Sequence, residues 1–357
     1  MKLLILTGKF GMGHWSASCS LKQQLEADHG VEAQVVDFFA AALPELSPTL
    51  YKGFNFLVTY GGGLYNLVHR LTANSAAPQF DPVADGLVEK LAGLLEETRP
   101  DAVVATHPVC AQLMSRFKRT YGSTLPLATC ITDVTCHSEW INPGTDCCFV
   151  CSPTVRDGLA AKGVDPRRIV ITGIPVREEF KQPVRRGGGL PRNLLIMGGG
   201  LGLMPRRESF YEALNALPII TGRNEKLYRR LAGKWEHIEV LGFTDRVYDY
   251  MARSDLMLTK PGGITMFEAI FSGLPLLAWA PYLAQERENA QFLTAAGVGL
   301  VTDKHPDACL RAIRDTIYND ALLASMEANM GLLKAQLKSE YVGAILAALT
   351  KGKQVAA

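Results

Sequence analysis

The chain has 357 residues, with 37 basic and 35 acidic side chains and a formal net charge of +2. This length accommodates two ordinary domains, each with its own buried core. The near balance of charge excludes a nucleic-acid-binding protein that depends on a strong positive field, so no nucleic-acid partner is expected.

Cysteine content and hydropathy indicate the compartment. Eight cysteines occur without a secretory signal, which favours a reducing cytoplasm over a disulfide framework. The first residues, MKLLILTGKFGMGH, have too short an apolar part for a signal peptide, and no apolar run approaches the ~20 residues that cross a bilayer. We therefore expect a cytoplasmic protein whose contact with the inner face of the cell membrane is peripheral.

The first predicted elements are a buried strand over Lys2–Leu6 and a helix that ends near Glu26. The loop between them carries three glycines, Gly8, Gly11 and Gly13. A strand followed by a glycine loop and a helix is how a doubly wound α/β domain begins, although the spacing Gly-x-x-Gly-x-Gly is not the dinucleotide fingerprint. His14 stands where the loop becomes helix, a position that suits either a structural cap or a site residue.

A second strand is predicted over Val31–Phe38, and an aromatic stretch follows it over residues 44–80. Five aromatic side chains there alternate with glycines and basic residues: Tyr51, Phe54, Phe56, Tyr60 and Tyr65. Such a stretch suits either a lipid interface or an ordinary pair of core helices with a loop, and the pattern leaves both interpretations open.

Polar residues follow two further strands, which come after a helix over Val83–Glu97. His107 lies just after a strand over Ala102–Ala105, and Asp133 lies just after a strand over Leu127–Ile131. The carboxyl end of a strand is where α/β domains place ligands, and a carboxylate there can serve as a general base. His137 and Trp140 follow shortly afterwards.

A cysteine-rich segment invites a zinc interpretation. The cysteines concerned are Cys136, Cys147, Cys148 and Cys151, with His137 beside the first. The run CCFVC nevertheless alternates as a buried strand does, and cysteine packs as a small hydrophobe. No second C-x-x-C or H-x-x-x-H completes four ligands, so we expect no metal site here.

A helix over Ser152–Gly163 and a strand over Ile169–Thr172 end the first half. We predict an N-terminal domain over residues 1–180, a linker over 181–193, a C-terminal domain over 194–335, and a tail over 336–357 that crosses back onto the first domain. The second half restarts with a strand over Leu194–Met197 and a glycine loop, and it closes with one long helical pattern from Ala308 to about Leu349.

Residues 255–289, DLMLTKPGGITMFEAIFSGLPLLAWAPYLAQEREN, hold the most informative pattern. A strand runs into Lys260-Pro261-Gly262-Gly263 and then a helix, whose first amides and dipole favour an anion such as a diphosphate. Thr265 and Glu268 share one face of that helix, where a carboxylate can accept hydrogen bonds from a ribose diol. Gln285-Glu286 opens the next helix, with Asn289 one turn on. Together these groups suit a nucleotide sugar.

This segment resembles the donor site of family 28 glycosyltransferases, which include the peptidoglycan N-acetylglucosaminyl transferase and the diacylglycerol galactosyl- and glucosyltransferases. The shared pattern runs from Asp255-Leu256 through Lys260–Gly263, Thr265 and Glu268-Ala269 to Gln285–Ala290, while Ala284 departs from the usual glycine. Gly-x-Gly-His at residues 11–14 and Thr132-Asp133, with Thr135-Cys136-His137 and Trp140, also resemble the diacylglycerol enzymes. The resemblance implies the GT-B fold, an α/β architecture of two Rossmann-like doubly wound domains facing a central cleft.

The resemblance further implies an inverting transfer of a hexose, galactose or glucose, from a UDP-sugar to the hydroxyl of diacylglycerol at the membrane surface. Asp133 is the expected base, with His14 as the rival; Gly13, His107, His137 and Trp140 are expected on the acceptor side. The expected donor-binding residues are Gly199, Gly200, Gly222, Asn224, Phe243, Thr244, Lys260, Gly262, Gly263, Thr265, Glu268, Gln285, Glu286 and Asn289. Helix N-termini and loop amides can hold the diphosphate, so no cofactor and no metal are expected.

Three alternatives remain open at this stage. The acceptor can be a polyprenyl-linked or other amphiphilic molecule. The protein can be a non-hydrolysing UDP-sugar epimerase of similar fold. It can also bind a donor without catalysis, which the presence of Asp133 and His14 argues against.

Overall fold

The computed structural model describes residues 1–27, 30–73, 81–182, 192–198, 208–214, 219–220, 224–234, 238–281 and 283–352. The chain forms two compact units. Unit 1 comprises Met1–Arg177 and Leu337–Ala357, and unit 2 comprises Glu178–Gln336. Most of the predicted linker, residues 183–191, lies outside the described residues.

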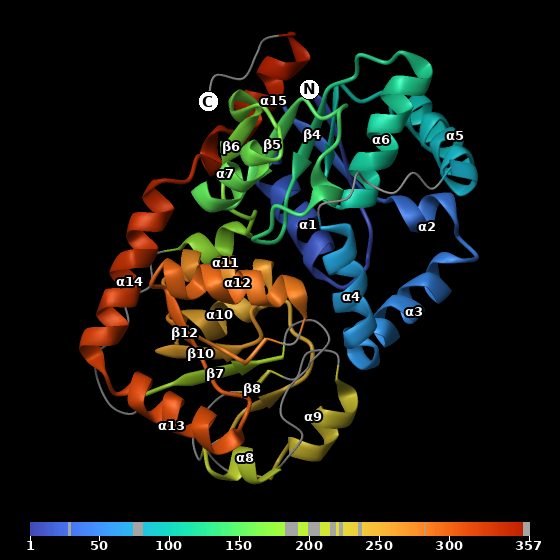
Figure 1. Ribbon diagram of the computed structural model, residues 1–357. Coiled ribbons are helices and arrows are strands. Elements are labelled where there is room, and N and C mark those ends of the chain that lie inside the picture. Colours follow the sequence, from blue (N-terminus) through green and yellow to red (C-terminus); the bar gives the residue numbers. More distant parts are fainter. Residues whose placement is uncertain are drawn as a thin grey trace. The chain divides into compact units, whose positions relative to one another are not determined.

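Unit 1 is built on a parallel sheet whose described strands run in the order β2-β1-β3-β4-β5-β6 (Figure 1). The strands are β1 (Lys2–Thr7), β2 (Glu32–Asp37), β3 (Ala102–Ala105), β4 (Leu127–Cys130), β5 (Cys147–Val150) and β6 (Ile169–Ile171). Leu6 pairs with Ala105, and Ala105 pairs with Thr129, so β1, β3 and β4 end at one level. The residues that follow these three strands therefore emerge along one edge of the sheet.

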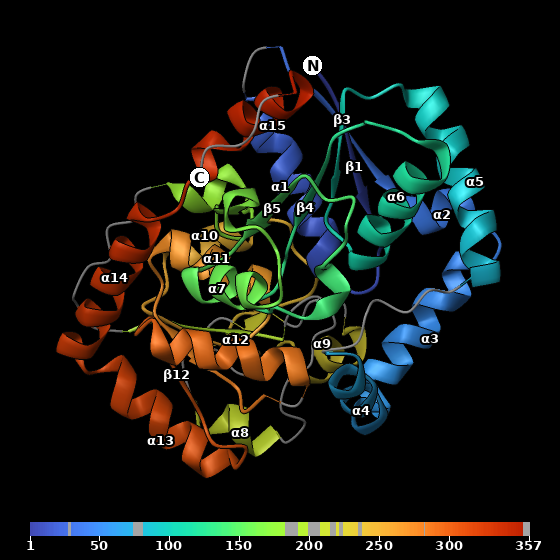
Figure 2. The same ribbon diagram turned by 45° about the horizontal axis from the view of Figure 1, so that its top comes forward.

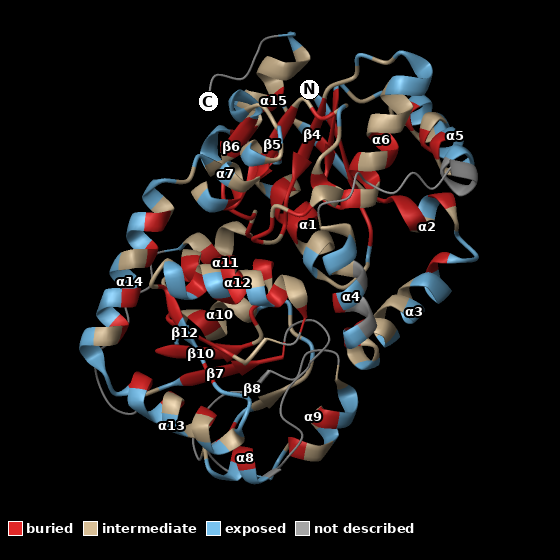
Figure 3. Cartoon of the chain, in the orientation of Figure 1, coloured by how far each residue is buried: buried red, intermediate tan, exposed pale blue. Residues whose placement is uncertain are grey.

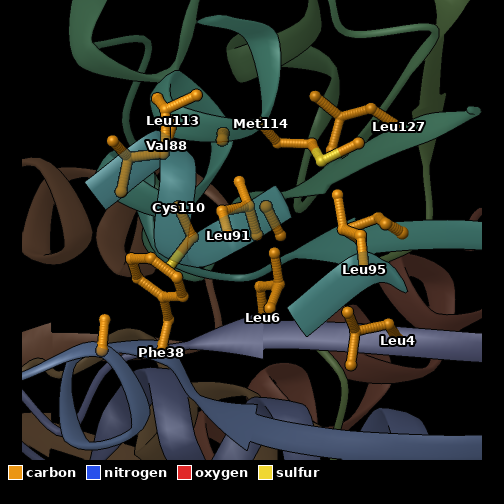
Figure 4. Packing of buried hydrophobic residues seen from close by; sticks show 14 of the residues in the cluster. Leu4, Leu6, Phe38, Val88, Leu91, Leu95, Cys110, Leu113, Met114 and Leu127 are labelled. Atoms are coloured by element: carbon orange, nitrogen blue, oxygen red, sulfur yellow. The ribbon is translucent and has the colours of Figure 1, made fainter. Parts of the chain in front are cut away.

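Helices and short 3₁₀ turns connect and cover these strands. They are α1 (Gly13–Glu26), α2 (Phe38–Ala42), α3 (Ser47–Tyr60), α4 (Gly62–Thr72), α5 (Asp81–Thr98), α6 (Pro108–Tyr121), α7 (Pro153–Ala161), α15 (Val342–Thr350), η1 (Ser138–Trp140), η2 (Pro166–Arg168) and η4 (Ser339–Tyr341). Figure 4 shows the core on one face, where Leu4 and Leu6 of β1 meet Leu91 of α5 and Met114 of α6. Because β3, β4 and β5 are buried along their whole length, they read as continuous apolar runs, as strands covered on both faces do.

The end of the chain belongs to unit 1. Val342 and Leu346 of α15 are part of the core that also contains Leu21 and Leu25 of α1, and Figure 2 shows the two helices in that unit. The single long helical pattern expected over residues 308–349 is wrong in detail. The structure has three α-helices and the 3₁₀ turn η4 there, because Asn319 caps a new helix and residues 336–338 leave the helical conformation.

Unit 2 has a second parallel sheet, with its described strands in the order β12-β11-β10-β7-β8-β9 (Figure 1). The strands are β7 (Leu194–Met197), β8 (Ile219–Ile220), β9 (Val240–Leu241), β10 (Leu256–Thr259), β11 (Leu276–Ala278) and β12 (Gly299–Val301). Its helices are η3 (Glu178–Lys181), α8 (Glu208–Glu212), α9 (Glu225–Leu231), α10 (Val247–Ala252), α11 (Gly263–Ser272), α12 (Ala284–Ala295), α13 (Pro306–Ile317) and α14 (Asp320–Ala335). Both sheets are parallel and alternate with helices, so the expected α/β fold of two doubly wound domains is confirmed.

The aromatic stretch forms the helices α3 and α4, which Figure 3 shows as largely exposed or half-buried. Six large apolar side chains on or beside them are exposed: Leu46, Leu50, Phe56, Tyr60, Leu67 and Leu71. Only Ser47 and Val58 of α3 are buried, so α3 is not an ordinary core helix. Among the helices described, none is long and apolar enough to span a bilayer.

Candidate active site

The strand order of unit 1 reverses between β1 and β3, and an open α/β sheet binds ligands at such a point. The loop after β1 carries Gly8 and Gly11, and each is glycine for a local reason. A Cβ on Gly8 would lie 2.8 Å from the Phe39 ring, and Gly11 has a φ of +75°. The loop delivers Gly13 and His14 to the start of α1, beside the residues that follow β3.

His14 is held by the backbone that follows β3. Its Nδ1 lies 2.9 Å from the Thr106 carbonyl oxygen and 2.8 Å from Thr132 Oγ1. Because the carbonyl only accepts, Nδ1 carries the proton, and Nε2 is left as the nitrogen that can face a substrate hydroxyl. Desolvation lowers the pKa of His14 to about 4, and the bond to Thr106 opposes this shift only in part. The imidazole is therefore neutral near pH 7.

His107 stands beside His14, with the two ring centroids 4.8 Å apart. Its Nδ1 accepts the backbone N–H of Val109 at 3.3 Å and so caps α6. Burial lowers the pKa of His107 well below its usual value, and the nearby His14 adds to this effect. Phe10 and Phe39 pack their rings at 5.2 and 5.5 Å from the His107 ring, which keeps this side of the site apolar.

The third strand of this edge, β4, delivers Asp133 and the segment that follows it. Asp133 is half-buried, and its backbone carbonyl accepts a contact from the Cys151 thiol at 3.7 Å. Trp140 is 2% exposed, and its ring lies 6.2 Å from that of His14. His137 is 4% exposed, and its Nε2 lies 3.0 Å from the His69 carbonyl of α4. The sequence did not predict this contact with α4. The edge thus gathers His14, His107, Asp133 and Trp140 from distant parts of the sequence.

The strand order of unit 2 reverses between β7 and β10, where Met197 pairs with Thr259. The Lys260–Gly263 turn follows β10 at this point, as the sequence pattern predicts for a ligand site. Three expected donor contacts, Gly199, Gly200 and Gly222, lie outside the described residues.

The N-terminus of α11 has the form expected of an anion site. Gly262 is its N-cap without a side-chain capping bond, and a Cβ there would meet no atom within 4 Å. The first amides of a helix have no partner inside the helix, so those from Gly263 onward can meet a ligand. Thr265 and Glu268 are half-buried while their neighbours in the helix are buried. The two side chains therefore share the less buried face, as the spacing of three predicts.

The second half of the motif braces the turn. Lys260 Nζ lies 3.2 Å from Glu286 Oε1, and Glu286 is 7% exposed. Asn289 is fully buried, and its Nδ2 donates to the Pro261 carbonyl at 2.9 Å. Glu286 and Asn289 thus position the Lys260–Gly263 turn, whereas the half-buried Gln285 at the start of α12 retains some exposure. Sequence reasoning assigned Glu286 and Asn289 direct donor contacts and missed this bracing.

The remaining donor candidates lie near the ends of β8 and β9. Asn224 accepts the Leu227 N–H at 3.0 Å and caps α9, and Thr244 Oγ1 accepts the Arg246 N–H at 3.1 Å. Phe243 is 61% exposed, an aromatic face that suits stacking on a nucleotide base.

The cysteine-rich segment forms β5, as its alternation indicates. Cys147, Cys148 and Cys151 are buried, and burial raises the pKa of the Cys148 and Cys151 thiols to about 12. Cys147 and Cys148 pack as protonated thiols in β5, and Cys151 does so just after the strand.

Two protein-family models match the chain. The Monogalactosyldiacylglycerol (MGDG) synthase model matches residues 14–176, and the Glycosyltransferase family 28 C-terminal domain model matches residues 213–340. The chain is 27% identical over 348 residues to a processive diacylglycerol beta-glucosyltransferase of Staphylococcus epidermidis, covering 92% of this chain and 88% of the relative.

Two solved structures share the fold over nearly the whole chain. The glycotransferase of kitacinnamycin superimposes with a TM-score of 0.64 at 17% identity, covering 98% of this chain and 99% of the other. Acinetobacter baumannii MurG superimposes with a TM-score of 0.62 at 16% identity, with the same coverage.

Proposed function

We propose that this chain, which belongs to the family 28 glycosyltransferases, is an inverting enzyme that moves a hexose from a UDP-sugar to the hydroxyl of diacylglycerol. The observation that carries the proposal is the match to the MGDG synthase model over residues 14–176. That span begins at His14 and includes His107 and Asp133, which follow β3 and β4 at the carboxyl edge of the unit 1 sheet. The relative from Staphylococcus epidermidis supports the same acceptor class.

Unit 2 holds the donor in this proposal. The amides from Gly263 onward meet the diphosphate at the start of α11, and no metal is required there. Glu268, on the less buried face of α11, accepts the ribose hydroxyls. Lys260 adds a positive charge near the diphosphate, and its ion pair with Glu286 fixes its direction. Gln285 contacts the sugar.

Unit 1 activates the acceptor. The acceptor oxygen attacks C1 of the hexose while the bond from C1 to the diphosphate oxygen breaks, and UDP leaves with that bonding pair. The hydroxyl proton passes to the Asp133 carboxylate. Burial lowers the pKa of His14 to about 4, so the imidazole loses the advantage that it ordinarily has over a carboxylate as a base near pH 7. Its bond to Thr106 fixes the ring, so His14 keeps a fixed place in the wall of the acceptor site.

The reaction takes place at a membrane surface in this proposal, because the acceptor is a lipid. The exposed apolar side chains of α3 and α4 support a peripheral contact there, and they include Phe56 at 66% and Leu71 at 68% exposure. The basic residues Lys52 and Arg70 on the same two helices are exposed and suit anionic head groups.

The deciding experiment incubates the protein with diacylglycerol vesicles and either UDP-glucose or UDP-galactose, and identifies the product by mass spectrometry and sugar analysis. We expect a monohexosyl diacylglycerol of inverted configuration from one of the two donors. Free epimerised sugar in the absence of vesicles would instead establish an epimerase. Transfer to a polyprenyl-linked acceptor alone would refute the diacylglycerol assignment.

A further inference from the structure

The C-terminal end of α4 is fixed by residues far away in the sequence. His137 Nε2 donates to the His69 carbonyl at 3.0 Å. The Ala73 carbonyl accepts from Ser138 Oγ at 2.7 Å and from Lys162 Nζ at 2.8 Å. The last carbonyls of a helix lack partners within the helix, so these donors hold the end of α4 against η1.

This arrangement brings two imidazole rings and a carboxylate together. The ring centroids of His69 and His137 are 4.3 Å apart. Glu139 Oε1 lies 3.6 Å from His137 Nδ1. One ligand atom from each of these three residues lies within 4.8 Å of the other two. Two imidazoles and one carboxylate form a donor set typical of zinc and related transition metals, whereas magnesium and calcium prefer oxygen ligands alone.

The hydrogen bonds around His137 favour metal ligation. A carbonyl only accepts, so the bond to the His69 carbonyl places the ring proton on Nε2 and leaves the lone pair on Nδ1. Metal-binding histidines commonly donate their second ring N–H to a carbonyl or carboxylate in this way. The Glu139 N–H now points at Nδ1 over a long 3.3 Å, a weak bond that a metal would displace.

We propose that His69, His137 and Glu139 bind one zinc ion, with a fourth position open to water. Tetrahedral zinc with these ligands needs donor atoms about 3.4 Å apart. The ligand atoms lie within 4.8 Å of one another, and the carboxylate of Glu139, whose side chain is 37% exposed, is already 3.6 Å from His137 Nδ1.

The ion would join α4 to the segment that follows Asp133. α4 carries the exposed Leu67 and Leu71, and η1 ends at Trp140 beside His14. Zinc occupancy therefore locks the exposed helix onto the loop that leads from the predicted base. The site depends on the position of three side chains and not on the proposed transfer reaction, so each can fail without the other.

Zinc binding by the untagged, chelator-treated full-length protein tests the site, using titration calorimetry with Zn²⁺ alone. We expect one equivalent to bind, and Glu139→Gln and His69→Gln each to weaken binding at least about tenfold. Two controls should bind zinc as the wild type does: Cys136→Ser removes the adjacent thiol, and His305→Asn removes an exposed histidine of unit 2. Cobalt substitution should give visible ligand-field bands without the ultraviolet thiolate charge-transfer band.

If a histidine variant fails to fold, Glu139→Gln still tests the zinc site, because this substitution changes only a partly exposed side chain. Its metal-free melting temperature should match that of the wild type. Absence of a zinc equivalent in the wild type would overturn the proposal. So would an unchanged affinity in Glu139→Gln, or loss of binding in Cys136→Ser.

Discussion

Acid sensitivity of unit 1 follows from the setting of His14. Its folded-state pKa is lowered to about 4 by desolvation, against an ordinary value of about 6.5. Between pH 6.5 and pH 4 the unfolded chain therefore binds a proton at this histidine that the folded chain does not bind. The contribution of neutral His14 to the free energy of unfolding is present above pH 6.5 and is lost as the pH falls toward 4.

The magnitude can be worked from this shift. Each pH unit in that window costs about 1.4 kcal/mol for one such group, so lowering the pH from 6.5 to 5 removes about 2 kcal/mol. Burial of His107 acts in the same direction. His14→Asn removes the His14 contribution, while its amide N–H replaces the donor that meets the Thr106 carbonyl. We expect this variant to lose about 2 kcal/mol less than the wild type on acidification.

The measurement must report on unit 1 alone, because a chain of two units need not unfold in one step. Hydrogen–deuterium exchange of peptides from α1 and β3, corrected for intrinsic exchange at each pH, gives the local opening free energy. His305→Asn, at an exposed position of unit 2, is the matched control and should leave the pH dependence unchanged. Equal pH dependence in the wild type and His14→Asn would refute the reasoning.

Three further predictions concern the proposed reaction. Glu268→Ala should weaken UDP binding by about 1–3 kcal/mol, the cost of losing hydrogen bonds to a charged group, and unchanged affinity by calorimetry would reject the ribose assignment. Asp133→Asn should keep UDP affinity while its turnover falls about 10²–10⁴-fold; near-normal turnover there, with a large loss in His14→Asn, would make His14 the base. Phe56→Ser should reduce vesicle binding about tenfold at an unchanged melting temperature, since burying a phenylalanine contributes roughly 1.5–3 kcal/mol. The Phe54 ring packs 5.4 Å from that of Phe10, so Phe54→Ser should instead lower the melting temperature. An equal fall in melting temperature in both variants would place both residues in the core.

The strands that carry the sites were predictable because a parallel sheet buries them on both faces. β3 and β7 begin and end where the apolar runs of the sequence begin and end. The polar residues just beyond such strands were predictable for the same reason, since the carboxyl edge is the part of the sheet left open to a ligand. This rule places His107 and Asp133 at that edge, and the family resemblance points to Asp133 as well.

Side-chain partners were less predictable, because residue type does not specify which neighbour a polar group meets. Asn289 in the donor motif was predicted only as a donor-binding residue, and in the structure its buried amide donates to the Pro261 carbonyl. Asn224 suggested a contact near the base, yet it caps α9. In both cases the backbone group to be satisfied lies at a turn or helix end, whose geometry appears only in the folded chain.

The cluster of His69, His137 and Glu139 shows the same limit more strongly. Metal motifs are recognised in a sequence by close spacing, and His137 was considered with its neighbouring cysteines for that reason. Cys147 and Cys148 instead pack inside β5, while the partner of His137 comes from the end of α4, 68 residues earlier. The two histidines lie together because the last carbonyls of α4 have no donors within the helix. His137, Ser138 and Lys162 donate hydrogen bonds to these carbonyls. A helix end that is capped from outside therefore creates side-chain neighbours that no local motif encodes, and such ends are places to search for sites in chains of this fold.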